Sequence, residues 1–154
     1  MRILRTVVST SMVALAVVCA GCSKDDQGIV KEGHLQIDKS VAIGKALDGY
    51  QYFGTKEWQA LKDERMGRVV VFKAEMSPAF IKELNDTCLK SDPKQKKIDG
   101  QKWSIQFSIG KDDTVNISGT QTLTTFSDKT EKAGSLNEAL MQSVYKNELA
   151  AVCQ

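Results

Sequence analysis

Apolar and polar residues alternate most clearly over residues 103–109, where every second position from Trp103 is apolar. This period of two is typical of a strand with one buried and one exposed face. The following Gly-Lys-Asp-Asp at residues 110–113 favours a turn, and residues 114–118 continue the alternation. The pattern therefore predicts a β-hairpin.

Two further segments have the character of strands. Residues 68–75 contain three consecutive valines and Phe72 between Gly67 and Pro78, which predicts a central strand covered on both faces. After Gly119, the threonine-rich residues 120–126 predict a strand at a sheet edge. With a short extended piece at residues 35–37, we expect about four strands.

Apolar residues at helical spacing predict the remaining elements. We expect a helix over residues 43–50 capped by Ser40, a second at 55–62 capped by Thr55, a third from Pro78 capped by Ser77, and a last from the capping box at 135–138 to about 151. The fold class is α+β: a single small domain in which an antiparallel sheet of about four strands packs against two to four helices, with one disulfide.

The first 21 residues form a separate segment. Arg2 and Arg5 precede an apolar stretch, and its uninterrupted part, residues 12–20, is too short to span a bilayer, which takes about 20 apolar residues. A positive start followed by a short apolar run is typical of a signal peptide.

Val17-Val18-Cys19-Ala20-Gly21-Cys22 resembles the lipobox of bacterial lipoproteins, with Cys19 standing where that family usually has an aliphatic residue. The resemblance implies cleavage before Cys22 and a lipid on its thiol. Ser23 after the cysteine implies the outer membrane, facing the periplasm. Residues 22–34 are polar and predict a lipidated tether, which leaves 35–154 as the periplasmic domain.

Cleavage would leave Cys88 and Cys153 as the thiols of the domain. In an oxidising envelope compartment, two remaining cysteines are most simply a disulfide. A redox-active or nucleophilic cysteine is the alternative, although neither Cys88 nor Cys153 belongs to a Cys-x-x-Cys motif.

The charge of the mature chain balances. The protein has 21 basic and 19 acidic residues, and the leader carries two arginines and no acid, so the remainder has a formal charge of zero. This balance disfavours a nucleic-acid partner. A local excess of lysine lies in residues 90–102, as a solvated loop or as a contact for an acidic partner or anionic lipid headgroup.

An aromatic cluster follows the first predicted domain helix: Tyr50, Tyr52, Phe53 and Trp58. Such residues fill cores more often than they form ligand-stacking surfaces, but exposed rings also anchor interfaces.

Few residues suggest catalysis. The one histidine, His34, lies in the expected tether, which disfavours histidine-based triads and multi-histidine metal sites. No nucleophile elbow or phosphate-binding loop is present, and we expect no metal or cofactor.

We therefore expect a non-enzymatic lipoprotein, bound to the membrane by its lipid, whose domain binds an envelope protein as an assembly component, inhibitor or immunity-type protein. The expected contact residues are Lys94, Lys96, Lys97, Tyr52, Phe53 and Trp58. The alternative is a lipid-anchored cell-wall hydrolase that uses paired carboxylates chosen from Glu57, Asp63, Glu64, Glu75 and Glu83.

Overall fold

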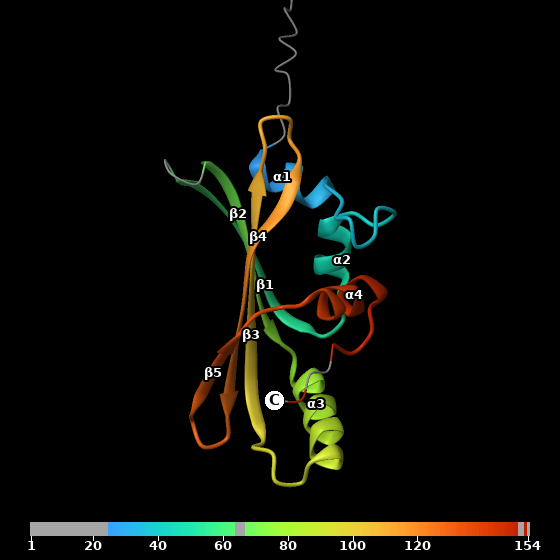
Figure 1. Ribbon diagram of the computed structural model, residues 1–154, viewed down its shortest axis with the longest axis vertical. Coiled ribbons are helices and arrows are strands. Elements are labelled where there is room, and N and C mark those ends of the chain that lie inside the picture. Colours follow the sequence, from blue (N-terminus) through green and yellow to red (C-terminus); the bar gives the residue numbers. More distant parts are fainter. Residues whose placement is uncertain (1–24, 64–66, 151–152, 154) are drawn as a thin grey trace, which may run out of the picture.

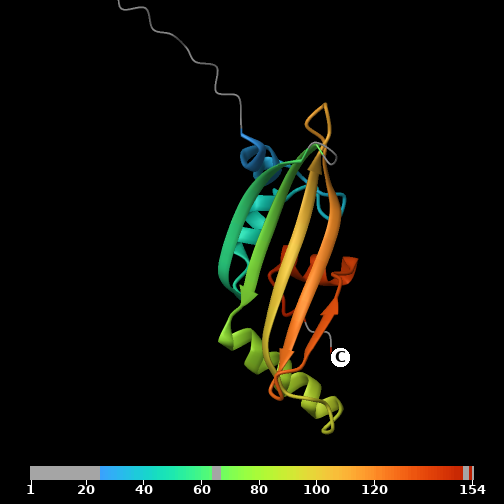
Figure 2. The same cartoon turned by 90° about the vertical axis from the view of Figure 1, so that its left-hand side faces the viewer.

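A five-stranded antiparallel sheet forms the centre of the molecule, and helices cover one of its faces (Figure 1). The computed structural model describes residues 25–63, 67–150 and 153. The opposite face of the sheet is open, as Figure 2 shows with the helices behind the strands. The predicted α+β class is confirmed, with one strand more than expected.

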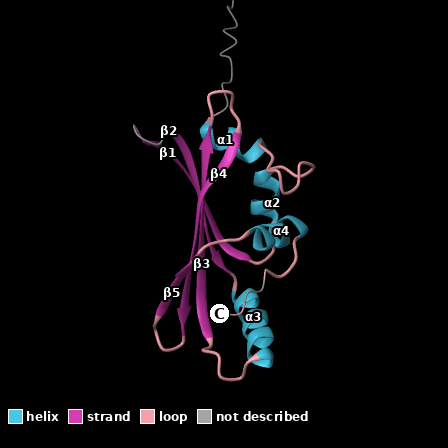
Figure 3. Ribbon diagram, in the orientation of Figure 1, coloured by secondary structure: helices cyan, strands magenta, loops and turns pink. Residues whose placement is uncertain are grey.

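The strands pair in chain order (Figure 3). They are β1 (Phe53–Asp63), β2 (Gly67–Met76), β3 (Ile98–Ile109), β4 (Val115–Phe126) and β5 (Glu131–Gly134). The helices of the described residues are α1 (Asp26–Glu32), α2 (Ile43–Gly49), α3 (Pro78–Ser91) and α4 (Glu138–Lys146).

The core lies between the covered face and the helices. Val70 and Phe72 of β2 and Phe107 of β3 are fully buried there and pack with Leu47 of α2 and Leu84 of α3. Burial of each such side chain contributes about 1.5–3 kcal/mol. Period-two alternation in β3 thus places its apolar residues against the helices, as its sequence predicts.

The expected helix at residues 55–62 is wrong, because this segment belongs to β1. Residues 58–62, Trp-Gln-Ala-Leu-Lys, have good helix propensity, but β1 pairs with the valine-rich β2 along its whole length, with Trp58 opposite Phe72. Pairing and packing with β2 override the local preference.

The C-terminal strands also differ from expectation. Gly119 does not separate two strands: β4 runs through it, and an irregularity of register at Gln106–Phe107 of β3 accommodates the extra residue. Residues 127–134, for which no element was predicted, contain β5, whose side chains are all exposed and give no alternating signal.

Residues 22–34 were expected to form a tether, but the structure differs from residue 25 onward. Asp25 caps α1 by accepting a hydrogen bond from the Gly28 amide at 2.6 Å, and Val30 is fully buried. Helix α2 approaches so closely that a Cβ on Gly44 would lie 2.8 Å from the Cβ of Lys31. The domain therefore begins at α1 and not at residue 35.

Helix caps were predicted with mixed success. Ser77 caps α3 as expected, accepting from the Phe80 amide at 3.2 Å, with Pro78 in the first turn. Helix α2 begins after Ala42, and Ser40 bonds to Asp38 instead. Helix α4 is capped by Asn137, so the capping box expected at residues 135–138 does not form.

The C-terminal segment is fastened to the helix layer. The predicted disulfide between Cys88 of α3 and Cys153 is present, with a Cα–Cα distance of 5.2 Å. The Tyr50 hydroxyl donates to the Glu148 carbonyl at 2.9 Å and accepts from the Ala150 amide at 3.2 Å. These contacts hold residues beyond α4 against α2 and α3.

Candidate functional site

The loop within the lysine-rich segment is shorter than expected. Helix α3 continues to Ser91 and β3 begins at Ile98, so only residues 92–97 lie outside regular structure. Lys90 belongs to the last turn of α3, where a cation is favourable to the helix dipole. Lys102 lies on β3 and pairs with Glu75 at 3.0 Å.

The turn between β4 and β5 holds this loop in place. Ser127 donates its amide to the Lys97 carbonyl at 2.9 Å, and Lys96 pairs with Asp128 at 2.7 Å. Lys129 of the same turn pairs with Asp99 at 2.8 Å. The loop is therefore held against the β4–β5 turn by a backbone hydrogen bond and an ion pair.

Hydrogen bonds lower the pKa of Asp128 in this turn. The ammonium of Lys96 and the hydroxyl and amide of Thr130 hold the pKa of Asp128 well below its ordinary value. Asp128 remains ionised at neutral pH and keeps Lys96 engaged. Within the part of the chain that the structure describes, no carboxylate forms an ion pair with the exposed Lys94 or Lys97.

The aromatic cluster divides into two buried rings, Tyr50 and Phe53, and two half-buried ones, Tyr52 and Trp58. Phe53 is 6% exposed and contacts the rings of Tyr50, Phe72 and Trp103, so it belongs to the core and cannot contact a partner in this conformation. This is the core interpretation considered for the cluster.

Tyr52 and Trp58 keep part of their surface in solvent. The Tyr52 hydroxyl donates to Glu83 at 3.0 Å, which raises the pKa of Tyr52. The Trp58 indole donates to Asp48 at 2.8 Å, and the ammonium of Lys31 lies 5.0 Å from its ring centroid. Both rings are thus engaged by neighbouring side chains.

The expected lysine and aromatic contacts do not form one surface. Tyr52 packs on Phe80 in the first turn of α3, whereas the lysine loop follows the last turn. Residues 81–91 of the helix lie between Phe80 and the loop and span roughly 17 Å. The structure brings Lys94, Lys96 and Lys97 together and leaves the aromatic segment apart.

A hollow on the open sheet face was missed by sequence reasoning. It has a volume of about 400 Å³ and crosses β1 to β4, where Glu57, Lys73, Glu75 and Lys102 surround the smaller Ser104. The residues 55–62 were assigned to a helix, so their alternation was not used. Exposure at Thr55, Glu57 and Gln59, combined with pairing to β2, places them on this face.

Two of the carboxylates considered for a hydrolase lie in this hollow. Glu57 and Glu75 are diagonal neighbours on β1 and β2, which places their backbones about 7 Å apart. Glu83 instead lies on α3, where it accepts a hydrogen bond from Tyr52. Glu64 and the side chain of Asp63 lie outside the described residues.

Other expected features have simple outcomes. His34 is exposed just after α1. In residues 25–63, 67–150 and 153, no group of three or more His, Cys, Asp or Glu side chains is placed to hold a metal ion. None of the helices in these ranges has the length and apolar character needed to cross a membrane. Cys22 lies outside them.

No protein-family model matches this chain, no curated protein matches its sequence, and no solved structure matches its fold.

Proposed function

We propose that this protein is a lipoprotein of the bacterial envelope, anchored by a lipid on Cys22, and that its domain binds an acidic partner protein through the lysine loop at residues 92–97. The lipobox resemblance of residues 17–22 supports the anchor. The observation that supports binding is the fixed position of Lys94 and Lys97 on a loop held by the β4–β5 turn.

A loop whose backbone is held in place favours binding because less conformational freedom is lost when a partner docks. The contacts of Lys96 with Asp128 and of Ser127 with Lys97 order the loop before any partner arrives. Lys94 and Lys97 then present positive charge to solvent, which steers an acidic surface and aligns it. Lys96 has a structural role in this scheme.

The experiment compares two charge reversals. Lys94→Glu with Lys97→Glu should abolish crosslinking to the partner in intact envelopes, and the wild-type complex should dissociate as salt rises. The matched control reverses Lys39 and Lys45, which are exposed elsewhere. Equal crosslinking by wild type and the loop variant would refute the proposed surface.

A second function, hydrolysis of cell-wall polymers, is favoured by the shared location of Glu57 and Glu75. An acid and a base separated by one reacting bond are the groups that glycoside hydrolysis needs. Glu75 is already paired with Lys102, and both carboxylates lie on an exposed surface. Release of soluble fragments from purified cell wall, lost in Glu57→Gln and Glu75→Gln, would establish this function instead.

A further inference from the structure

The described domain begins three residues after Cys22. Asp25 caps α1, and three residues of extended chain reach about 10 Å. A lipid on Cys22 would therefore hold the start of α1 at the membrane surface.

We propose that the domain stands upright on the membrane, with its α1 end against the headgroups and its lysine loop directed away. This inference rests on the lipid anchor of the proposed function. It assigns the membrane-facing surface to α1 and the β3–β4 turn.

Several contacts prevent α1 from swinging away from the sheet. Arg68 of β2 pairs with Asp26 of α1 at 2.9 Å and with Asp113 of the β3–β4 turn at 2.8 Å. Val30 is buried in the common core. A Cβ on Gly33 would lie 3.0 Å from the Val115 side chain, so the end of α1 also lies against β4. The anchored helix and the sheet move as one body.

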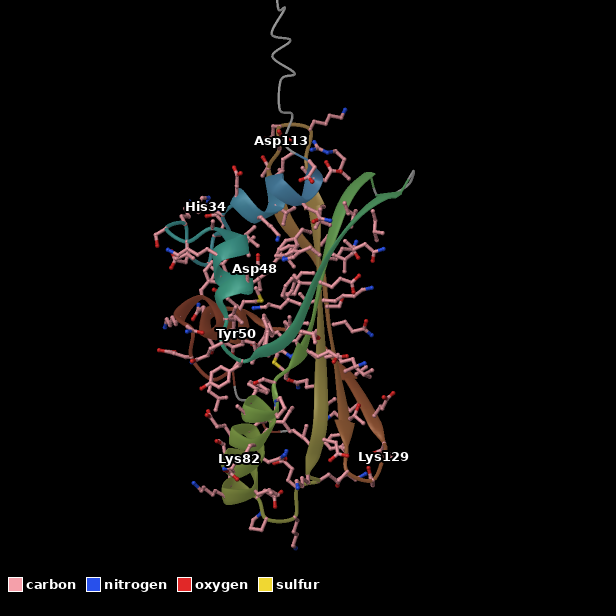
Figure 4. The ribbon with its side chains drawn as sticks, turned by 180° about the vertical axis from the view of Figure 1, so that it is seen from behind. His34, Asp48, Tyr50, Lys82, Asp113 and Lys129 are labelled. Atoms are coloured by element: carbon pink, nitrogen blue, oxygen red, sulfur yellow. A yellow bond between two sulfur atoms is a disulfide. The ribbon has the colours of Figure 1, made fainter. Side chains whose placement is uncertain are left out.

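The lysine loop lies at the other end of the long axis. Figure 4 shows Asp113 and Lys129 at opposite ends of the molecule. Strand β3 starts at Ile98 beside the lysine loop and ends at Ile109 before the β3–β4 turn, and its 12 residues span about 40 Å.

Charge disfavours a molecule lying on its side. The open sheet face carries Lys73 and Lys102 balanced by Glu57 and Glu75 around its hollow. A surface helix or sheet that binds lipid needs a basic excess beside exposed apolar side chains. The short chain between Cys22 and α1 is then the main constraint, and α1 lies at one end of the long axis (Figure 1).

This orientation selects the class of partner. At physiological ionic strength, charge is screened over about 8 Å, so headgroups of the anchoring membrane do not reach a loop about 40 Å away. Lys94 and Lys97 would meet an acidic protein surface and not the lipid headgroups of that membrane.

Fluorescence quenching tests the orientation on full-length protein extracted from membranes and reconstituted in phosphatidylethanolamine–phosphatidylglycerol vesicles. A dye is placed on Lys111→Cys at the β3–β4 turn or on Lys94→Cys in the lysine loop, and the quencher is attached to lipid headgroups. We expect strong quenching at position 111 and almost none at position 94. Equal or stronger quenching at position 94 would overturn the upright orientation.

A tether variant provides the matched control. Ten Gly and Ser residues inserted between Lys24 and Asp25 should reduce quenching at position 111 several-fold while the protein stays in the vesicles. Unchanged quenching would mean that the short chain does not set the orientation, and would contradict the inference. Intact mass separates the two proposals: an unmodified Cys22 overturns both, whereas a lipidated Cys22 with quenching at position 94 overturns the orientation alone.

Discussion

The two faces of the sheet are built by the same strands but have different chemistry. On β2, Val70 and Phe72 lie under the helices with no exposure, whereas Lys73 and Glu75 on the other side face solvent. This is the arrangement that an antiparallel sheet allows when only one side is covered. The covered face therefore holds the fold together, and the open face is free to carry surface chemistry.

Val69 and Val71 of β2 show that some residues on the open face are shielded from solvent. They are 1% and 8% exposed, although no helix covers them. Gln59 of β1 and Gln106 of β3 are the cross-strand partners of Val71, so their side chains lie beside it on the same face. Burial on the open face comes from neighbouring strands, whereas burial on the covered face comes from packed helices. Four predictions test this difference.

The largest expected effect is removal of the disulfide that holds the helix layer. Cys88→Ala with Cys153→Ala should lower the free energy of unfolding by about 4 kcal/mol, because the unfolded chain gains the freedom of a 65-residue loop. Urea denaturation of the oxidised wild type and of the variant measures the change. A loss below about 1 kcal/mol would show that the helices stay in place without the bridge.

The second largest effect is expected at alkaline pH, which should lower the free energy of unfolding through two tyrosines on the covered side. Burial raises the pKa of Tyr50 to about 12, and burial also raises the pKa of Tyr145 to about 12. Between the ordinary tyrosine pKa of about 10 and about 12, the unfolded chain releases protons that the native state retains. The stabilisation is complete below pH about 10 and is lost as the pH rises through 12.

Single variants assign this alkaline loss to residues. Denaturation profiles from pH 9 to 12 should be flatter in Tyr50→Phe and in Tyr145→Phe than in wild type. Tyr145→Phe removes an ionisable hydroxyl without breaking a hydrogen bond, because this buried hydroxyl has no hydrogen-bond partner in the part of the chain that the structure describes. It therefore isolates the effect of ionisation more cleanly than Tyr50→Phe does. An unchanged slope in both variants would contradict the assignment.

Adjacent valines of β2 provide the closest comparison of the two faces. Val70→Thr places a hydroxyl in the apolar core and should cost about 2 kcal/mol, because nothing there satisfies it. Val71→Thr makes the same change on the open face, where the hydroxyl can turn to water, and should cost less than about 1 kcal/mol. Equal losses measured by thermal denaturation would mean that the faces do not differ as proposed.

The smallest effect is expected at the charged part of the open face. Lys73→Ala should change the free energy of unfolding by less than about 0.5 kcal/mol, since Lys73 is exposed and lies opposite Glu57. Urea denaturation would measure it. A loss above about 1 kcal/mol would assign a structural role to this pair.

Strong local patterns predicted much of the fold. The alternation around Phe107, the valine run of β2 and the Ser77–Pro78 start of α3 each agree with the tertiary structure, and so does the pairing of Cys88 with Cys153. In these places local preference and packing point to the same element.

The remaining elements depend on contacts that a single segment does not contain. Helix α1 offers only Ile29 and Val30 as apolar residues, and Val30 is buried because α2 and the sheet meet it. Strand β1 forms because β2 pairs with it, and β5 because β4 does.

The same limit applied to the candidate sites. The exposure of Lys94 and Lys97 was expected from composition, but the contact of Lys96 with Asp128 joins segments far apart in the chain. The hollow with Glu57 and Glu75 required the correct pairing of β1 with β2. Phe53 and Tyr52 are sequence neighbours of similar character, and only packing decides which ring is buried.

The burial of Cys88 has a consequence for the time at which the thiols are oxidised. This sulfur lies on the inner side of α3 with 2% of the residue exposed, so an oxidant or a disulfide exchange enzyme cannot reach it in the finished domain. The bridge must form while α3 is still undocked, or during docking itself. Slow oxidation after export would leave a folded protein in which later oxidants reach the thiol of Cys88 only when α3 opens.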